Sequence, residues 1–199
     1  MAVGIHRRGS GVATAEYIDK VDEFGMEATY QAELERLREE GCSDPEAYVH
    51  RVHTRACSEE VRDHEAAGDV LRELEVRDVI TQPYPGFDFL VVDHDESRAE
   101  RCIELKSSGT NMRRPSISWN EWKSASNMDL RDAYYLYVAV GLETGNSGEA
   151  RLIQIPDPFA TLDSREKKTR SYSREVQVRL SEFNPEEEEV VEQLIYWGG

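Results

Sequence analysis

One run of ten residues constrains the fold of this chain more than any other stretch. Residues 133–142, AYYLYVAVGL, are almost continuously apolar and rich in β-branched and aromatic side chains. Such a run is typical of a β-strand that is covered on both faces, because a strand with one solvated face alternates apolar and polar residues. The run therefore predicts an α/β fold, with helices packed against both sides of a sheet.

Shorter patterns predict the elements around this strand. The polar stretch 95–100 separates two apolar runs closely enough to make them an antiparallel hairpin, and a helix near 118–127 can carry the chain to a parallel strand. The predicted sheet is therefore mixed. Strands are expected at 76–82, 87–93, 101–107, 150–158 and 175–180, and helices at 13–40, 45–52, 58–74, 118–127 and 184–197.

The length of 199 residues allows one domain with an extension. Residues 1–57 are predicted to form a helical extension, partly disordered at its glycine-containing N-terminus. Residues 58–199 are predicted to form the mixed-sheet domain.

The net charge of −16 opposes non-specific binding to nucleic acid, because the field of the whole molecule repels phosphates. A halophilic source would also explain the charge, since concentrated salt screens it. Residues 164–179 are the exception, with six basic and two acidic residues. They are interpreted either as a solvated loop entering a strand or as a contact to a nucleic-acid backbone through Lys167, Lys168 and Arg170.

No apolar run is long enough to cross a membrane, and the N-terminus lacks a secretory signal pattern, so a cytoplasmic protein without membrane partners is expected. Three widely spaced cysteines predict neither a disulfide framework nor a zinc knuckle. The histidines also lack the spacing of zinc ligands. The cysteines are Cys42, Cys57 and Cys102, and the histidines compared are His53, His64 and His94.

The chemistry-bearing residues lie on the predicted hairpin. Asp88 and Glu104 fall on its two neighbouring strands, where cross-strand side chains converge. Two carboxylates with room for water suit Mg²⁺, or Mn²⁺ in its place. Lys106 lies two residues after Glu104 and so on the same side of the strand, where it can hold or deprotonate a water and stabilise phosphate charge. The combination is typical of phosphodiester hydrolysis.

The same residues also have purely structural interpretations. Asp88 can be a turn residue, and Glu104 with Lys106 can be a charge pattern on an exposed face. Glu121 can be a further acid, but Ser118 and Glu121 have the spacing of a capping box, which we favour.

Gly86-Phe87-Asp88 followed by Ile103-Glu104-Leu105-Lys106-Ser107 resembles the PD-(D/E)xK signature of the restriction-endonuclease-like superfamily. With ISWNEWKSASNMDLRDAYYLYVAV at 117–140 and IQIPDP at 153–158, residues 58–160 are similar to the NO VEIN C-terminal domain family. The signature's proline is displaced, because Pro85 lies three residues before Asp88.

The resemblance implies a restriction-endonuclease-like fold. It implies that Asp88 and Glu104 bind the metal and that Lys106 is the catalytic lysine. It also implies a glutamate on the preceding helix, for which Glu65 is the best candidate, with Asp69 as a substitute.

The expected function is a Mg²⁺-dependent nuclease domain that acts on DNA, in restriction or defence. The alternative is an inactive nuclease-fold module that binds nucleic acid or a larger ATPase or helicase-like partner, as the resemblance implies.

Overall fold

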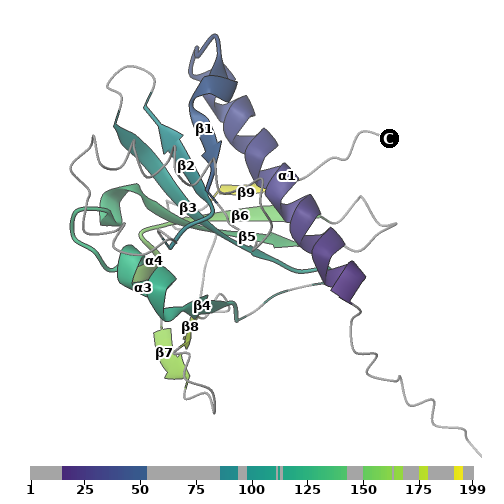
Figure 1. The fold of residues 1–199 in the computed structure, drawn as a ribbon, viewed down its shortest axis with the longest axis vertical. Helices are drawn as coiled ribbons and strands as arrows, with labels where there is room; N and C mark the ends of the chain where they lie inside the picture. Colours follow the sequence, from purple (N-terminus) through teal and green to yellow (C-terminus); the bar gives the residue numbers. More distant parts are fainter. Residues whose placement is uncertain are drawn as a thin grey trace, which may run out of the picture.

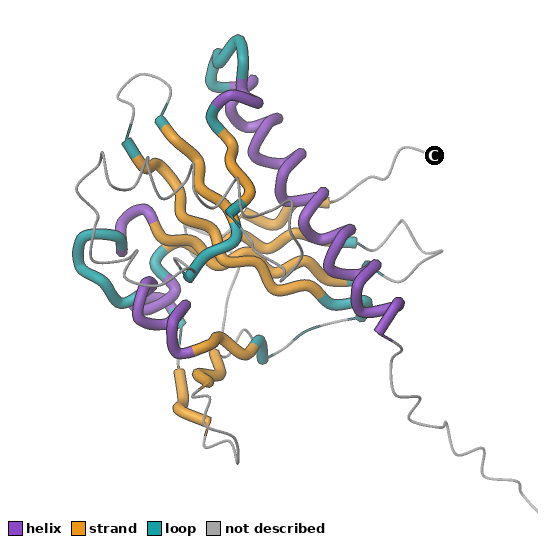
Figure 2. The backbone as a smooth tube through the Cα atoms, in the orientation of Figure 1, coloured by secondary structure: helices purple, strands orange, loops and turns teal. Residues whose placement is uncertain are grey.

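The computed structural model describes residues 15–52, 86–93, 98–110, 112, 114–142, 150–162, 164–167, 175–178 and 191–194. In these residues a six-stranded mixed sheet is covered on its two faces by different elements, as Figures 1 and 2 show. The strand order is β1-β2-β3-β5-β6-β9. The strands are β1 (Val49–Arg51), β2 (Phe89–Val92), β3 (Ala99–Ser107), β5 (Tyr134–Val140), β6 (Arg151–Pro156) and β9 (Val191–Leu194). The predicted α/β class with a mixed sheet is confirmed.

The central strands are arranged as the sequence predicted. β2 and β3 form an antiparallel hairpin, and β3 pairs with β5 in parallel. β5 contains the apolar run that opened the sequence analysis. Six of its seven residues are buried, which confirms that this strand is covered on both faces.

The long helix α1 (Ala15–Glu39) packs on one face of the sheet (Figure 1). Its buried Leu34 and Leu37 meet Ile103 and Leu105 of β3 in one hydrophobic cluster. The helix runs unbroken through Gly25. A β-carbon at Gly25 would lie 2.0 Å from the Ser107 hydroxyl oxygen, so the glycine allows α1 to approach β3 closely.

The opposite face is covered by α3 (Trp119–Ala125) and α4 (Pro158–Thr161), with a small second sheet beside them (Figure 1). That sheet has the order β4-β8-β7. Its strands are β4 (Ser116–Ser118), β7 (Ser164–Lys167) and β8 (Glu175–Val178). The predicted strand at 175–180 therefore exists, but it belongs to the small sheet. Residues 164–167 form a strand too, whereas a solvated loop was one of the two interpretations of the segment 164–179.

Two helix predictions were wrong. Pro45 begins only the single 3-10 turn η1 (Pro45–Ala47), and residues 49–51 form strand β1, which pairs with β2. Residues 191–194, expected in a closing helix, form β9 at the edge of the main sheet beside β6. Residues 15–51 thus contribute a helix and a strand to the main core. The expected boundary at residue 57 and the predicted elements at 58–74 and 76–82 lie outside the described residues.

Candidate active site

Asp88 lies immediately before β2, where the regular pairing with β3 ends. Phe89 is paired with Ile103, so the next position on each strand brings Asp88 opposite Glu104. The ladder is irregular at this point: the Asp88 N–H donates to the Ile103 carbonyl at 2.7 Å. In place of a second backbone acceptor, the Asp88 Oδ2 accepts a hydrogen bond from the Leu105 N–H at 2.7 Å. The Asp88 carboxylate is therefore fixed against β3 beside Glu104.

Glu104 and Lys106 share one face of β3. The Nζ of Lys106 donates to Oε1 of Glu104 at 2.5 Å. Leu105, between them, points to the other face and joins the cluster beneath α1. The side chain of Glu104 is only 5% exposed and that of Lys106 is 20% exposed, so the pair is not the solvated surface pattern of the structural alternative.

Glu121 also reaches this site. It closes the predicted capping box: the Glu121 N–H donates to the Ser118 hydroxyl oxygen, and the Ser118 N–H donates to Glu121 Oε2 at 2.7 Å. The same Oε2 accepts a hydrogen bond from Lys106 Nζ at 2.9 Å. The capping box is confirmed, but the contact to Lys106 was not predicted. The capping-box pattern predicts that the Glu121 carboxylate lies on the first turn of a helix. Nothing in the sequence indicates that this turn faces β3.

Burial and crowding of negative charge shift the pKa values of the site. The pKa of Glu104 lies well above its usual value because the carboxyl is buried, and the nearby Asp88 carboxylate raises it further. For Lys106, burial lowers the pKa, but attraction to Glu104, Glu121 and Asp88 outweighs this and the net shift is upward. Three carboxyl groups thus surround one ammonium group, which favours the binding of another cation.

Gly86 and Tyr134 hold the turn that leads into Asp88. Gly86 has a φ of +84°, and a β-carbon there would lie 2.5 Å from the Ser124 hydroxyl oxygen of α3. Its carbonyl accepts a hydrogen bond from the buried Tyr134 hydroxyl at 2.7 Å. Burial raises the pKa of Tyr134 well above its usual value, and the Glu104, Glu121 and Asp88 carboxylates add to the shift. The positive φ and the close approach of α3 both require glycine at position 86.

The residues present fit a divalent cation. Asp88 and Glu104 offer hard oxygen ligands side by side, and a cation between them would offset the repulsion that, after burial, adds to the raised pKa of Glu104. Mg²⁺ commonly binds through one or two carboxylates and keeps several waters. Among the residues that the structure describes, no group of three or more His, Cys, Asp or Glu side chains could hold a metal ion.

Several predicted site residues cannot be placed with this trio. Lys167 is the last residue of β7, for which the structure describes only the backbone. Glu65, its substitute Asp69, Lys168 and Arg170 lie outside the described residues. So do Cys57, His53, His64 and His94, for which no metal site was predicted. Cys42 and Cys102 are buried free thiols, and burial raises the pKa of Cys102 to about 12.

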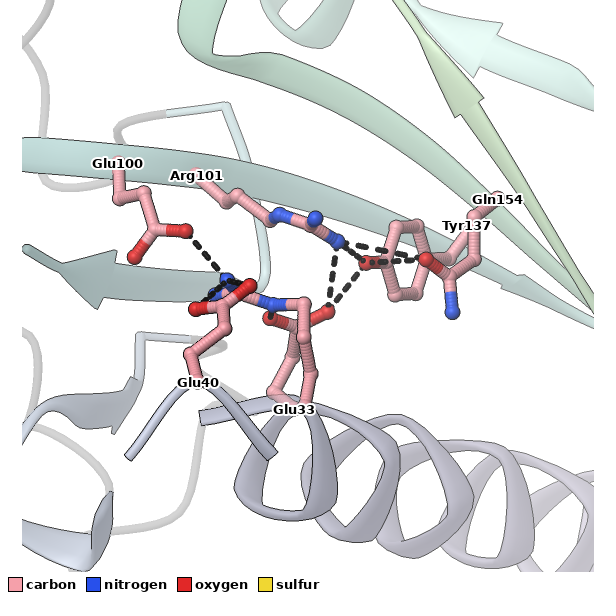
Figure 3. Close-up of polar contacts among 7 residues, drawn as sticks. Glu33, Glu40, Glu100, Arg101, Tyr137 and Gln154 are labelled. Carbon is pink, nitrogen blue, oxygen red and sulfur yellow. Dashed lines mark hydrogen bonds and ion pairs between the residues drawn. The ribbon is translucent and has the colours of Figure 1, made fainter. Parts of the chain in front are cut away.

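A second polar cluster lies on the opposite face of β3 and was not predicted (Figure 3). Glu33 of α1 is fully buried and pairs with Arg101 of β3 at 3.2 Å. The Tyr137 hydroxyl donates to the same carboxylate, and Arg36 pairs with its other oxygen at 2.9 Å. Gln154 completes the cluster through the Tyr137 hydroxyl at 3.1 Å. Each charge has a partner of opposite sign, so the cluster ties α1 to the sheet.

No helix in the described residues is long and apolar enough to cross a membrane.

Comparison with known families places most of the chain in a family. Residues 27–153 match the family described as Protein NO VEIN, C-terminal. The match begins within α1 and ends in β6, so it includes the C-terminal part of α1 and all of β1, which the resemblance at 58–160 had left out. It contains Asp88, Glu104, Lys106 and Glu121. No curated protein and no solved structure matches the chain.

Proposed function

The chain belongs to the Protein NO VEIN C-terminal domain family, and on this premise we propose that it is a Mg²⁺-dependent nuclease domain of the PD-(D/E)xK type that hydrolyses phosphodiester bonds in DNA. The observation that carries the proposal is the convergence of Asp88, Glu104 and Lys106. The Asp88 carboxylate is hydrogen-bonded to the backbone between the other two residues, and Lys106 contacts Glu104 directly.

Each residue has a distinct task in this proposal. Asp88 and Glu104 would hold the cation, with Glu65 as a further ligand. When bound, the cation would supply Lewis-acid polarisation of a phosphoryl oxygen. Lys106 is held as an ammonium group by two carboxylates. This state suits it to hydrogen-bond a phosphate oxygen and to offset its charge.

The basic segment 164–179 supports nucleic acid as the ligand, because Lys and Arg side chains attract phosphate groups and the other long segments of the chain are acidic. Its strands β7 and β8 belong to the small sheet, which joins α3 through β4. Lys167, Lys168 and Arg170 are proposed to contact the phosphate backbone. A cytoplasmic location and a role in restriction or defence, alongside a larger ATPase or helicase-like partner, complete the proposal.

A second candidate is a module with the same fold that binds nucleic acid or such a partner without turnover. The net charge of −16 and the deep burial of Glu104 favour it, because both hinder the approach of a phosphate.

Nicking of supercoiled plasmid separates the two candidates. Purified chain is incubated with Mg²⁺ or Mn²⁺ from low to molar salt. The nuclease proposal predicts nicking that Lys106→Ala abolishes and that Lys123→Ala, on the exposed side of α3, retains. Intact plasmid under every condition, with DNA retained in a mobility-shift assay, would support the module and refute the nuclease.

A further inference from the structure

Glu121 joins the first turn of α3 to the lysine of the candidate active site. Its Oε2 accepts hydrogen bonds from the Ser118 N–H at 2.7 Å and from Lys106 Nζ at 2.9 Å. We propose that Glu121 is a positioning residue that holds the Lys106 ammonium group where it meets the phosphate of the substrate. This inference rests on the proposed nuclease function.

The capping role alone does not account for a glutamate at this position. Glutamine also closes a capping box, because its side-chain oxygen accepts the same backbone N–H. A carboxylate adds a charge-assisted hydrogen bond to Lys106, which is stronger than a neutral one. Both side chains are 20% exposed, so water screens the pair only in part.

Lys106 needs a second anchor if Glu104 is a metal ligand. A carboxylate that turns its oxygens to a cation is a weaker partner for an ammonium group. The lysine side chain has four rotatable carbon–carbon bonds and would then leave its position. Glu121 supplies an anchor that does not depend on Glu104.

The anchor itself is rigid. Ser118 fixes Glu121 through both bonds of the capping box, and α3 is packed into the core by the largely buried Trp122 and the fully buried Ala125. Ser118 is also the last residue of β4, which pairs with β8. The position of Lys106 is thereby tied to α3 and to the small sheet together.

The contact can be tested without any nuclease assay. Native chain is labelled with a limiting amount of an amine-reactive reagent, and labelling of Lys106 is compared with labelling of the exposed Lys123 by peptide mass spectrometry. In Glu121→Gln, the ratio of Lys106 to Lys123 labelling is expected to rise severalfold, while the far-ultraviolet circular dichroism stays unchanged because the cap is kept. Ser118→Ala removes the hydroxyl but keeps the backbone N–H that donates to the Glu121 carboxylate, so its ratio is expected to match that of the native chain. An unchanged ratio in Glu121→Gln would overturn the proposal.

Kinetics test the positioning role. Glu121→Gln is expected to lower kcat for nicking by about ten- to a hundredfold, the usual effect of losing a supporting partner, with KM for DNA unchanged. Native kcat in this variant would refute the inference even if the labelling ratio changes. A native chain that nicks no DNA would refute the proposed function and this role of Glu121, whereas the labelling ratio would still decide whether Glu121 holds the lysine.

Discussion

The Asp88 carboxylate takes the place of a backbone acceptor, because its Oδ2 lies 2.7 Å from the Leu105 N–H. One interaction thus completes the hydrogen bonding of β3 and holds an acid beside Glu104. Loss of the side chain would leave a buried N–H without an acceptor, whereas an amide at this position keeps an oxygen that can accept the bond.

Substitutions at Asp88 are therefore expected to separate stability from metal binding. Asp88→Ala should lower the free energy of unfolding in urea by about 1–3 kcal/mol, the cost of an unsatisfied buried donor. Asp88→Asn should retain most of the stability and lose the binding of Mn²⁺, measured by isothermal titration calorimetry. Asp129→Asn, at an exposed position after α3, is the control and should bind Mn²⁺ like the native chain. Equal Mn²⁺ affinity in Asp88→Asn would remove Asp88 from the proposed ligands.

The elements that the sequence predicted well have strong local patterns. The run in β5 and the hairpin of β2 and β3 each carry their signal within a few residues, and so does the capping box of α3. Because the two hairpin strands were recognised, Asp88, Glu104 and Lys106 could be predicted to meet. The contact of Glu121 with Lys106 depends on how α3 lies against β3, which no local pattern contains.

The missed elements depend on contacts distant in the chain. β1 has only three residues, and its pairing with β2 is what makes it a strand. Residues 191–194 follow an acidic run with good helix formers, yet they pair with the edge strand β6, so tertiary contact overrides local preference. Glu33 and Arg36 resemble the solvated face of a charged helix in sequence, and only the fold shows that they face the sheet.

The raised pKa of Glu104 predicts how stability depends on pH. Above its ordinary pKa of 4.5, Glu104 binds its proton more tightly in the folded chain than in the unfolded chain, so its contribution to stability falls as pH rises toward the folded pKa. Glu104→Gln should make this decline shallower, as measured by urea denaturation at a series of pH values without divalent cations. Added Mg²⁺ should make the native decline shallower too, because a cation favours the ionised carboxylate. Parallel curves for the native chain and Glu104→Gln would contradict the shift.

Comparing Gly86 with Gly41 measures the effect of the close approach of α3 to the turn at Gly86. Both have positive φ, of +84° and +96°, but a β-carbon at Gly41 would meet nothing within 4 Å, whereas one at Gly86 would meet Ser124 and Asn120. Gly41→Ala is expected to lower the free energy of unfolding by about 1–3 kcal/mol through backbone strain alone. Gly86→Ala should lower it further, and Ser124→Ala in the same chain should restore part of the difference. Equal losses at the two glycines would show that α3 does not press on the turn before Asp88.

Substitutions in the buried cluster around Glu33 should lower the free energy of unfolding more than the sequence suggests, because the sequence there resembles the exposed face of a charged helix. Glu33→Ala would leave Arg101 and Arg36 with one partner fewer at the buried interface of α1 and β3. Removing one member of a buried ionic cluster typically costs about 3–5 kcal/mol. We expect a loss of this size in urea denaturation, with a change below about 0.5 kcal/mol for Glu39→Ala on the exposed end of the same helix.

The Tyr137 hydroxyl also donates to Glu33, so Tyr137→Phe combined with Glu33→Ala should be less destabilising than the sum of the two changes. Strict additivity in this double-mutant cycle would mean that the Tyr137 hydroxyl and the Glu33 carboxylate contribute independently to stability, so that their hydrogen bond adds nothing.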